Sequence, residues 1–308
     1  MRAAAIEEFG GPEKLRLADL PDPKVGPDYI LIRARAAGVN PVDFKIREGK
    51  LEGAFPHFFP LVPGWDVAGV VEQTGPAVTG LSEGDEVVAY CRKDFVGEGT
   101  YAELVSVKAD QAAPKPAALS FEEAAALPLA GLTAFQALHE KLEIAEGETV
   151  LIHAASGGVG RFAVQLARLA GAQVIGTASA ANHEALRELG AMELIDYSEQ
   201  DFVAALGDSH PGGVDAVLDL VGGDALERSP EVLGEGGRIA SVSQPAEKVS
   251  YVFVRPDSGQ LAHLGSLADS GELKVSLAET LALEEAARAH ELLESGGVSG
   301  KIALSIAG

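Results

Sequence analysis

The sequence contains little cysteine, little basic charge and no long apolar run. Cys91 is the one cysteine among 308 residues, which excludes an internal disulfide and a cysteine-rich metal site. No stretch of about eighteen apolar residues occurs, so we expect no membrane-spanning helix and no membrane partner. Lys and Arg total 24 against 46 Asp and Glu, and the net charge of −22 disfavours nucleic acid, which requires a positive footprint.

The rest of the composition is that of an ordinary globular protein. Hydrophobic residues account for 47% of the chain and charged residues for 23%. A length of 308 residues is enough for two modest domains, each with its own core. Residues 1–8 turn acidic too early for a secretory signal, and with the single cysteine this predicts a cytoplasmic protein.

The most informative segment is the glycine turn at residues 153–160, HAASGGVG. Residues 149–152 before it are typical of a buried strand, and residues 161–170 after it have apolar residues at helical spacing. Strand, glycine turn and helix together place a dinucleotide pyrophosphate at a helix N-terminus, where N–H groups and the helix dipole stabilise negative charge. Ala155 replaces the first glycine of G-x-G-x-x-G, and the turn alone could be a tight structural connection. The predicted phosphate-binding residues are Ser156, Gly157, Gly158, Val159 and Gly160.

Residues after the next predicted strand, 173–177, indicate which nucleotide binds. NAD-selective folds usually place Asp or Glu about twenty residues beyond the turn, and this region has no acid. Thr177, Ser179 and His183 instead offer donors to a 2′-phosphate, which predicts NADPH. Two alternatives stay open. Ser179 could cap the following helix, and NADH use is possible because neutral imidazole binds phosphate less well than ammonium.

The chain changes character near residue 120. Before it, short strands are separated by Gly, Pro and Asp turns. From Ser120 a capping box opens a helix, and strands then alternate with helices to about residue 255, which predicts a parallel sheet with helices on both faces. A helix at 283–293 and a last strand at 301–306 are expected to follow. The predicted strands of the parallel sheet are 149–154, 173–177, 194–196, 214–219 and 237–242.

Several motifs occur in a characteristic order over nearly the whole chain. They are AGVNPVD (37–43), PGWDVAGVV (63–71), GLSEGDEV (80–87), LPLAGLTA (127–134), the glycine turn and GKIAL (300–304). With these motifs the chain resembles the medium-chain dehydrogenase/reductase superfamily. The resemblance implies an α/β protein, in which a β-rich GroES-like catalytic domain accompanies a doubly wound Rossmann domain. The implied domains are residues 1–120 with 261–308 for the catalytic domain and 121–260 for the dinucleotide-binding domain.

Two of these motifs indicate whether the protein binds a catalytic zinc ion. Zinc-dependent members of the superfamily carry Cys in the first motif and Gly-His-Glu in the second, where this chain has Asn40 and Gly64-Trp65-Asp66. A catalytic zinc needs three ligands of the Cys, His or carboxylate type, which Asn40, Trp65 and Asp66 cannot supply. We therefore expect no metal. The chain resembles the zinc-free quinone oxidoreductase branch, close to alkenal and enone reductases that share Asn-Pro-Val-Asp-Phe-Lys.

This resemblance implies hydride transfer from NADPH to a small electrophile, either a quinone or an α,β-unsaturated carbonyl. The anion formed on the acceptor needs a hydrogen-bond donor and then a proton. Asn40 is the implied catalytic residue, which either orients the nicotinamide carboxamide or donates to the substrate oxygen. Lys45 is expected to stabilise negative charge on the substrate. The plainer alternatives are that Asn40 caps its own turn and that Lys45 is solvated.

Further contacts are implied at the pocket and along the cofactor. Phe59 and Tyr90 are candidate pocket walls, although aromatic residues at such positions are often plain core. Thr133 could equally be a helix residue that bonds its own backbone. The implied cofactor contacts beyond the glycine turn and residues 177–183 are Thr133, Tyr197, Val221, Gly222, Ser241, Val242 and Phe253.

Assembly and a rival function complete the expectations. Relatives are often homodimers joined by edge strands of the cofactor domain, and residues 250–254 could pair in that way or lie inside the sheet. A rival is an NADPH-binding sensor or scaffold with little turnover, because fold does not fix function. A zinc alcohol dehydrogenase is a third option.

Overall fold

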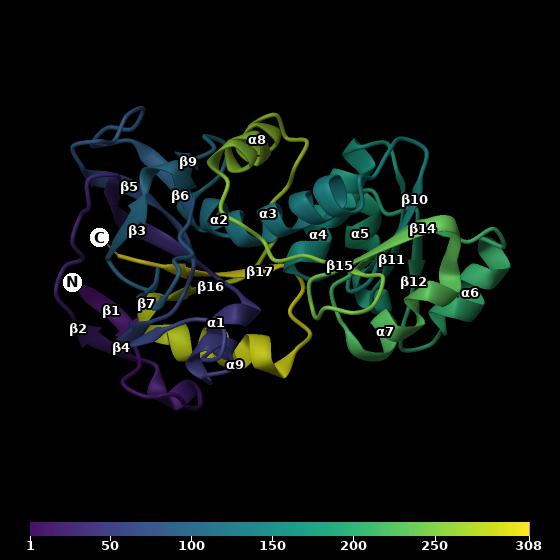
Figure 1. Cartoon of the computed structure of the whole chain (residues 1–308), viewed down its shortest axis with the longest axis horizontal. Helices are drawn as coiled ribbons and strands as arrows, with labels where there is room; N and C mark the ends of the chain where they lie inside the picture. The colour runs from purple at the N-terminus through teal and green to yellow at the C-terminus, as the bar shows by residue number, and fades with distance from the viewer. Residues whose placement is uncertain (308) are drawn as a thin grey trace. The chain divides into compact units, whose positions relative to one another are not determined.

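The computed structural model describes residues 1–307, which form two compact units; most of their strands and helices are labelled in Figure 1. The β-rich unit comprises Met1–Leu129, Pro256–Gly271 and residues 275–307, and the parallel-sheet unit comprises Ala130–Arg255 and Glu272–Lys274. Within residues 1–307, no helix combines the length and the apolar character needed to cross a bilayer.

The β-rich unit is built on a seven-stranded sheet in the order β16-β17-β3-β5-β6-β9, with β8 also paired to β3. The longest strand, β3, buries its apolar side chains and exposes Arg33 and Arg35, as expected for a half-buried strand. Ile302 of β17 pairs with Val39 of β3, so the start of β17 lies beside the end of β3. The strands are β3 (Tyr29–Val39), β5 (Asp66–Thr74), β6 (Glu86–Tyr90), β8 (Leu104–Lys108), β9 (Ala112–Pro114), β16 (Leu277–Ala282) and β17 (Lys301–Ser305).

Short helices and two small ribbons surround this sheet. Helix α2 packs closely on β3 because Gly38 has no side chain: a Cβ there would lie 2.2 Å from the Ala125 carbonyl oxygen. Helix α8 was not predicted, and it begins after Asp257, whose carboxylate accepts the Gln260 N–H at 2.9 Å. The ribbons are β1 (Arg2–Ala5) with β2 (Arg16–Asp19) and β4 (His57–Val62) with β7 (Val96–Glu98); the helices are α1 (Pro41–Arg47), α2 (Phe121–Ala125), α8 (Ser258–Asp269) and α9 (Ala286–Ser295), with 3₁₀ turns at Pro12–Lys14, Ala109–Gln111 and Leu283–Glu285.

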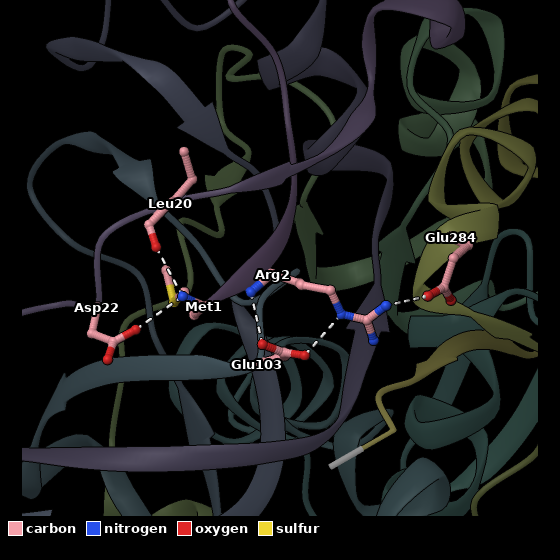
Figure 2. Close-up of polar contacts among 6 residues, drawn as sticks. All are labelled: Met1, Arg2, Leu20, Asp22, Glu103 and Glu284. Atoms are coloured by element: carbon pink, nitrogen blue, oxygen red, sulfur yellow. Dashed lines mark hydrogen bonds and ion pairs between the residues drawn. The ribbon is translucent and has the colours of Figure 1, made fainter.

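Polar contacts tie the N-terminal residues to distant segments of the β-rich unit (Figure 2). The Met1 ammonium donates to the Leu20 carbonyl oxygen at 2.8 Å and pairs with Asp22 at 3.0 Å. Arg2 pairs with Glu103 at 3.0 Å and with Glu284 at 3.2 Å. Exposed ion pairs of this kind contribute little stability each, but they show that the tail after residue 275 folds against the first strand.

The parallel-sheet unit has the strand order β12-β11-β10-β13-β14-β15, and every neighbouring pair is parallel. Numbered along the chain from β10, this order is 3-2-1-4-5-6, the order of the dinucleotide-binding Rossmann fold. The strand order reverses between β10 and β13, and ligands of such sheets bind at the carboxyl ends of the strands near that point. The strands are β10 (Thr149–Ile152), β11 (Gln173–Thr177), β12 (Glu193–Ile195), β13 (Val214–Asp219), β14 (Leu233–Ser241) and β15 (Ser250–Tyr251).

Helices follow most of these strands and bury an apolar core. The core includes Leu151, Ile175 and Val217 from three neighbouring strands, with Phe202 and Leu226 from two helices. The helices are α3 (Pro128–Gln136) with a π-helical continuation (Ala137–Lys141), α4 (Gly158–Leu169), α5 (His183–Leu189), α6 (Phe202–Ser209) and α7 (Gly223–Arg228), with 3₁₀ turns at Ala180–Asn182 and Ser229–Val232.

Candidate active site

The glycine turn joins β10 to α4 in the parallel-sheet unit. Gly157 is the N-cap of α4, and no described side chain caps the first turn, whose N–H groups have no acceptor within the helix. Gly160 is required by packing, because a Cβ there would lie 2.4 Å from the Ala154 carbonyl oxygen. Ala155, at the position of the missing glycine, is buried against Gly176 of β11, where a Cβ would lie 2.9 Å from its side chain. The turn therefore offers backbone donors to an anion.

Buried hydrogen bonds support this turn from the sheet. The Thr177 hydroxyl accepts the Ala154 N–H at 3.1 Å and lies 3.3 Å from His153 Nδ1. On the other side of the ring, His153 Nε2 lies 3.3 Å from Ser229 Oγ. Burial lowers the pKa of His153 to about 4, so the ring is neutral at pH 7. Thr177, a predicted cofactor contact, is 4% exposed, and the structure places its hydroxyl in support of the turn.

The region predicted to bind a 2′-phosphate follows β11. Ser179 is the N-cap of a 3₁₀ turn, where its side chain makes no capping bond and instead accepts the Asn182 amide at 3.0 Å. His183 Nε2 lies 3.0 Å from a backbone carbonyl oxygen of the same segment. The segment itself carries no acid, but Asp196, which follows β12, lies beside it and accepts a backbone N–H of the 3₁₀ turn at 2.9 Å. Sequence reasoning missed it because parallel pairing of β11 and β12 brings together residues far apart in the chain.

A buried carboxylate organises the carboxyl ends of β13 and β14. Asp219 accepts the N–H groups of Val221 at 3.0 Å and Gly222 at 2.9 Å. The same carboxylate accepts the Ser241 hydroxyl at 2.6 Å, and the Asp219 carbonyl oxygen accepts the Val242 N–H at 3.1 Å. Gly222 has φ +83°, a conformation that favours glycine. The fold thus brings these predicted cofactor contacts, Val221, Gly222, Ser241 and Val242, to one edge of the sheet.

Large apolar side chains are exposed along this same edge. Tyr197 is 66% exposed, Val221 57% and Phe253 52%, and each follows the carboxyl end of a parallel strand. Exposed apolar surface at the ligand-binding edge of an open α/β sheet fits the rings of a dinucleotide. Thr133 differs from these residues, because it lies in α3 and is 4% exposed.

Asn40 is the centre of a buried polar group in the β-rich unit. Asn40 directly follows β3, is the N-cap of α1 and is 2% exposed; Pro41 takes the first helical position. Its Nδ2 donates to Asp66 Oδ2 at 2.8 Å, and its Oδ1 accepts a hydrogen bond from the ammonium of Lys301. Lys301 Nζ also donates to the Val39 carbonyl oxygen at 2.9 Å. Asn40 also caps its own turn through its backbone: its carbonyl oxygen accepts the Asp43 N–H at 2.9 Å, while its side-chain atoms bond Asp66 and Lys301.

A chain of hydrogen bonds continues from Asn40 into α9. Asp43 Oδ2 accepts the Asn40 backbone N–H at 2.8 Å and the Tyr101 hydroxyl at 2.9 Å. Tyr101 lies 3.3 Å from His290 Nε2, and His290 Nδ1 lies 3.2 Å from the Arg47 guanidinium. Burial, with the nearby Arg47 charge, lowers the pKa of His290 to about 3, so the neutral ring accepts from Arg47 and donates to Tyr101.

Burial is the largest influence on the pKa values of the charged residues in this group. It raises the pKa of Asp43 to about 7 and that of Asp66 to about 6, whereas it lowers the pKa of Lys301. Asp66 is the better supported carboxylate, because its Oδ1 also accepts the Leu129 N–H at 2.9 Å. Asp43 Oδ1 is buried without a partner among the described residues. The motifs NPVD and PGWD thus together place two buried carboxylates around the Asn40 amide and the Lys301 ammonium.

The remaining predicted site residues of the β-rich unit lie in different surroundings. Lys45 is exposed on α1. Phe59 is 42% exposed and packs edge-on against Phe9, with ring centroids 5.1 Å apart. Tyr90 is fully buried, with its ring 6.2 Å from that of Trp65. Lys45 and Phe59 therefore lie at the surface and Tyr90 in the core.

The described residues contain no cluster suited to a metal ion. Across residues 1–307, no three or more His, Cys, Asp or Glu side chains are grouped so that they could hold one. Cys91 is buried, and burial raises the pKa of its thiol. The positions at which zinc-dependent members carry ligands hold the Asn40 amide and the Asp66 carboxylate, bonded to each other.

Comparison with known proteins agrees with both units. The alcohol dehydrogenase GroES-like domain matches residues 26–117, and the zinc-binding dehydrogenase family matches residues 189–304. The 2-methylene-furan-3-one reductase of Solanum lycopersicum is 35% identical, over 99% of this chain and 79% of its own. The structure of the quinone oxidoreductase from Coxiella burnetii has a TM-score of 0.90 at 37% identity, covering 100% of this chain and 99% of that one. Escherichia coli quinone oxidoreductase complexed with NADPH has a TM-score of 0.86 at 33% identity, covering 99% of this chain and 100% of that one.

A GroES-like domain joined to a Rossmann-type domain is the composition of the medium-chain dehydrogenases and reductases. The chain belongs to that superfamily and, within it, to the branch of quinone oxidoreductases and enone reductases. The predicted superfamily, the predicted fold class and the prediction that the protein is an oxidoreductase are confirmed.

Proposed function

We propose that the protein is a zinc-independent, NADPH-dependent oxidoreductase that reduces quinones or α,β-unsaturated carbonyls such as alkenals and enones. The observation that carries the proposal is the Asn40 amide, held between a buried ammonium and a buried carboxylate where zinc-dependent relatives carry Cys. An amide donates a hydrogen bond to an oxygen that gains negative charge, whereas it is not one of the usual zinc ligands. Quinones and conjugated carbonyls are acceptors that need such a donor but no metal.

The cofactor is assigned to the parallel-sheet unit. The N–H groups of Gly158, Val159 and Gly160, with the dipole of α4, would hold the pyrophosphate. Arg161, whose Nε donates to the Ser156 carbonyl oxygen at 3.1 Å, adds positive charge beside the turn. Bound NADPH would supply a hydride to the acceptor. Exposed apolar residues at the carboxyl edge of the sheet, Tyr197, Val221 and Phe253, would cover its rings.

Preference for NADPH over NADH rests on a balance of charges. The Ser179 hydroxyl, which accepts the Asn182 amide, can donate to a 2′-phosphate, and the E. coli relative was solved with NADPH; the Nε2–H of His183 is directed at a backbone carbonyl oxygen. Asp196 opposes a 2′-phosphate, because the hydrogen bonds from Ser198 lower the pKa of its carboxyl group and keep it ionised. We therefore propose a preference for NADPH that is modest and that permits use of NADH.

The residues of the β-rich unit would act on the charge that the reaction creates. Hydride addition to a quinone, or to the β-carbon of an enone, leaves a negative charge on the acceptor oxygen. Asn40 would donate a hydrogen bond to that oxygen, and a proton from solvent would complete a two-electron reduction. Lys45, which is exposed on α1, would add a favourable but solvent-screened charge.

We further propose a cytoplasmic homodimer. β15 is the edge strand of the parallel sheet, and both of its residues are exposed, with Tyr251 at 39%. An edge strand presents unpaired N–H and C=O groups, which a second copy of the chain could complete. Sedimentation of the wild-type protein and of a Tyr251→Pro variant tests this, since proline removes one N–H donor from the edge.

The function is tested by following the absorbance of reduced nicotinamide with a panel of quinones, enones and saturated ketones. We expect rapid oxidation of NADPH with the first two classes and little with the ketones, since an isolated ketone needs stronger polarisation. The better acceptor class would separate quinone reduction from enone reduction. Tight NADPH binding without turnover of any acceptor would instead support the sensor or scaffold.

A further inference from the structure

Asn40, Asp66 and Lys301 form a buried group in which the Asn40 amide is held by two charged side chains. All three side chains are nearly inaccessible, with Asn40 at 2%, Asp66 at 0% and Lys301 at 4% exposure. They come from the end of β3, the start of β5 and the start of β17, so three separate segments converge on one amide. Burial of a lysine ammonium destabilises the folded state unless partners compensate the charge.

The two charged neighbours permit one orientation of the Asn40 amide. Lys301 Nζ has donors only, and it meets the amide oxygen. Asp66 Oδ2 is an acceptor when ionised, and it meets the amide nitrogen at 2.8 Å. Rotating the amide by half a turn would place the carbonyl oxygen against the carboxylate and the NH₂ group against the ammonium. Both charge-assisted hydrogen bonds would be lost and replaced by repulsion.

We propose that Lys301 is a positioning residue: its ammonium occupies Asn40 Oδ1, so that the amide offers the substrate a hydrogen-bond donor and no free acceptor. This rests on the proposed function, and it deepens that function by fixing which hydrogen bond Asn40 can offer. The second N–H of Nδ2 has no partner among the described residues. Asn40 can therefore donate to an oxygen, such as that of a quinone or enone carbonyl, but it cannot accept from a group that must itself donate, such as the NH₂ of a carboxamide.

The ammonium also strengthens the donor that it fixes. Hydrogen bonds in a chain polarise one another in a low-dielectric interior, so a cation on the amide oxygen withdraws electron density from the amide N–H. Burial lowers the pKa of Lys301, and two carboxylates oppose that effect by favouring its charged form: Asp66 at 3.8 Å and, further along the hydrogen-bond chain, Asp43. Asp66 holds the nitrogen side in place.

The chain itself offers a direct readout of the Asn40 amide. Asn40 and Asn182 are its two asparagines, so ¹⁵N-asparagine labelling reports on two side-chain NH₂ groups. In the wild-type protein we expect one Asn40 amide proton to be protected from exchange by its bond to Asp66. Asn182, which bonds Ser179 Oγ in the other unit, is the internal control. An Asn40 NH₂ group that exchanges as fast as a solvated amide would overturn the proposal without any variant.

Lys301→Met keeps the length of the side chain and removes the ammonium. We expect its Asn40 resonances to shift or broaden while those of Asn182 stay fixed, and we expect a fall of roughly tenfold in kcat with a smaller change in KM for NADPH. The matched control is Lys115→Met, a lysine of the same unit whose side chain is 7% exposed and pairs with Glu86 at 3.3 Å. We expect it to leave kcat and the Asn40 resonances unchanged.

The outcomes separate this proposal from the proposed function. Unchanged Asn40 resonances and unchanged kcat in folded Lys301→Met would refute the positioning role even if the wild-type enzyme reduces quinones. If instead no acceptor is turned over by the wild type, the proposed function fails while the NMR comparison still decides whether Lys301 fixes the amide. If Lys301→Met does not fold, exchange of the Asn40 NH₂ group in the wild type as fast as that of a solvated amide would still overturn the proposal.

Discussion

Two glycines of the same turn should respond oppositely to alanine. Gly160→Ala would place a Cβ 2.4 and 2.6 Å from two backbone carbonyl oxygens, which cannot move aside without moving the turn. Gly157→Ala would meet nothing closer than one carbonyl oxygen at 3.4 Å, and its φ of −72° with ψ of 175° suits alanine. Gly160→Ala should therefore disturb the packing of the turn and lower stability. Gly157→Ala should leave the packing intact and place a methyl group in front of the helix N-terminus.

The magnitudes follow from these distances. Overpacking typically costs about 1–3 kcal/mol, and a clash with two backbone atoms belongs at the upper end of that range. For a unit of this size, about 3 kcal/mol lowers Tm by roughly 6–12 °C. Gly157→Ala should not lower Tm. Alanine reduces the conformational entropy of the unfolded chain, which stabilises the folded state by about 0.4–1 kcal/mol. It should instead weaken NADPH binding by tenfold or more, which is about 1.4 kcal/mol, because its methyl group occupies the approach of the phosphates.

The assays are thermal unfolding without cofactor and a fluorescence titration with NADPH. Gly207→Ala on α6 is the control, since a Cβ there has no neighbour within 4 Å; we expect a slightly higher Tm and unchanged binding. A Gly160→Ala variant as stable as the wild type would refute the packing argument. A Gly157→Ala variant that binds NADPH normally would refute the assignment of the pyrophosphate to this turn.

Further predictions concern cofactor choice and pH. His183→Lys should raise affinity for NADPH but not for NADH, and Asp196→Asn should act in the same direction by removing a charge that repels the 2′-phosphate; equal effects on both cofactors would contradict the assigned region. Burial raises the pKa of Asp43 from 3.8 to about 7 in the folded state. Its contribution to stability is therefore complete below about pH 4 and is lost as the pH rises toward 7. Between about pH 4 and 7, the Tm of the wild type should thus fall relative to the Tm of Asp43→Asn. A rise of the wild-type Tm relative to that of the variant would contradict this.

The strands of the parallel sheet could be predicted from sequence because hydrophobic runs and turn residues are local patterns. Strands 173–177 and 214–219 appear with their predicted bounds, and the glycine turn lies between a strand and a helix as expected. Strand 237–242 was predicted too short, because glycines at its start hid the extension to Leu233. Helix α8 was missed because its mixture of Gly, Ser and His has weak helical periodicity.

The candidate site was less readable because its contacts join distant segments. Asn40 was identified by its motif, but nothing near it in sequence shows that Lys301 binds its amide oxygen. The carboxylate of Asp196 entered the nucleotide region through pairing of β11 and β12. Thr177 carried a plausible hydroxyl, yet the sheet buries it beneath the turn. Residue type and spacing thus identify candidate residues, while tertiary pairing decides which groups remain available to a ligand.

Reduction of hydride acceptors without a metal is the property on which the proposed function depends most. The most direct measurement is the rate of NADPH oxidation with a quinone and an enone by protein from which metals have been removed with a chelator, with metal content determined on the same sample. We expect a metal-free protein with an undiminished rate. A rate that disappears with the metal and returns with one equivalent of zinc would contradict the account and restore a zinc alcohol dehydrogenase.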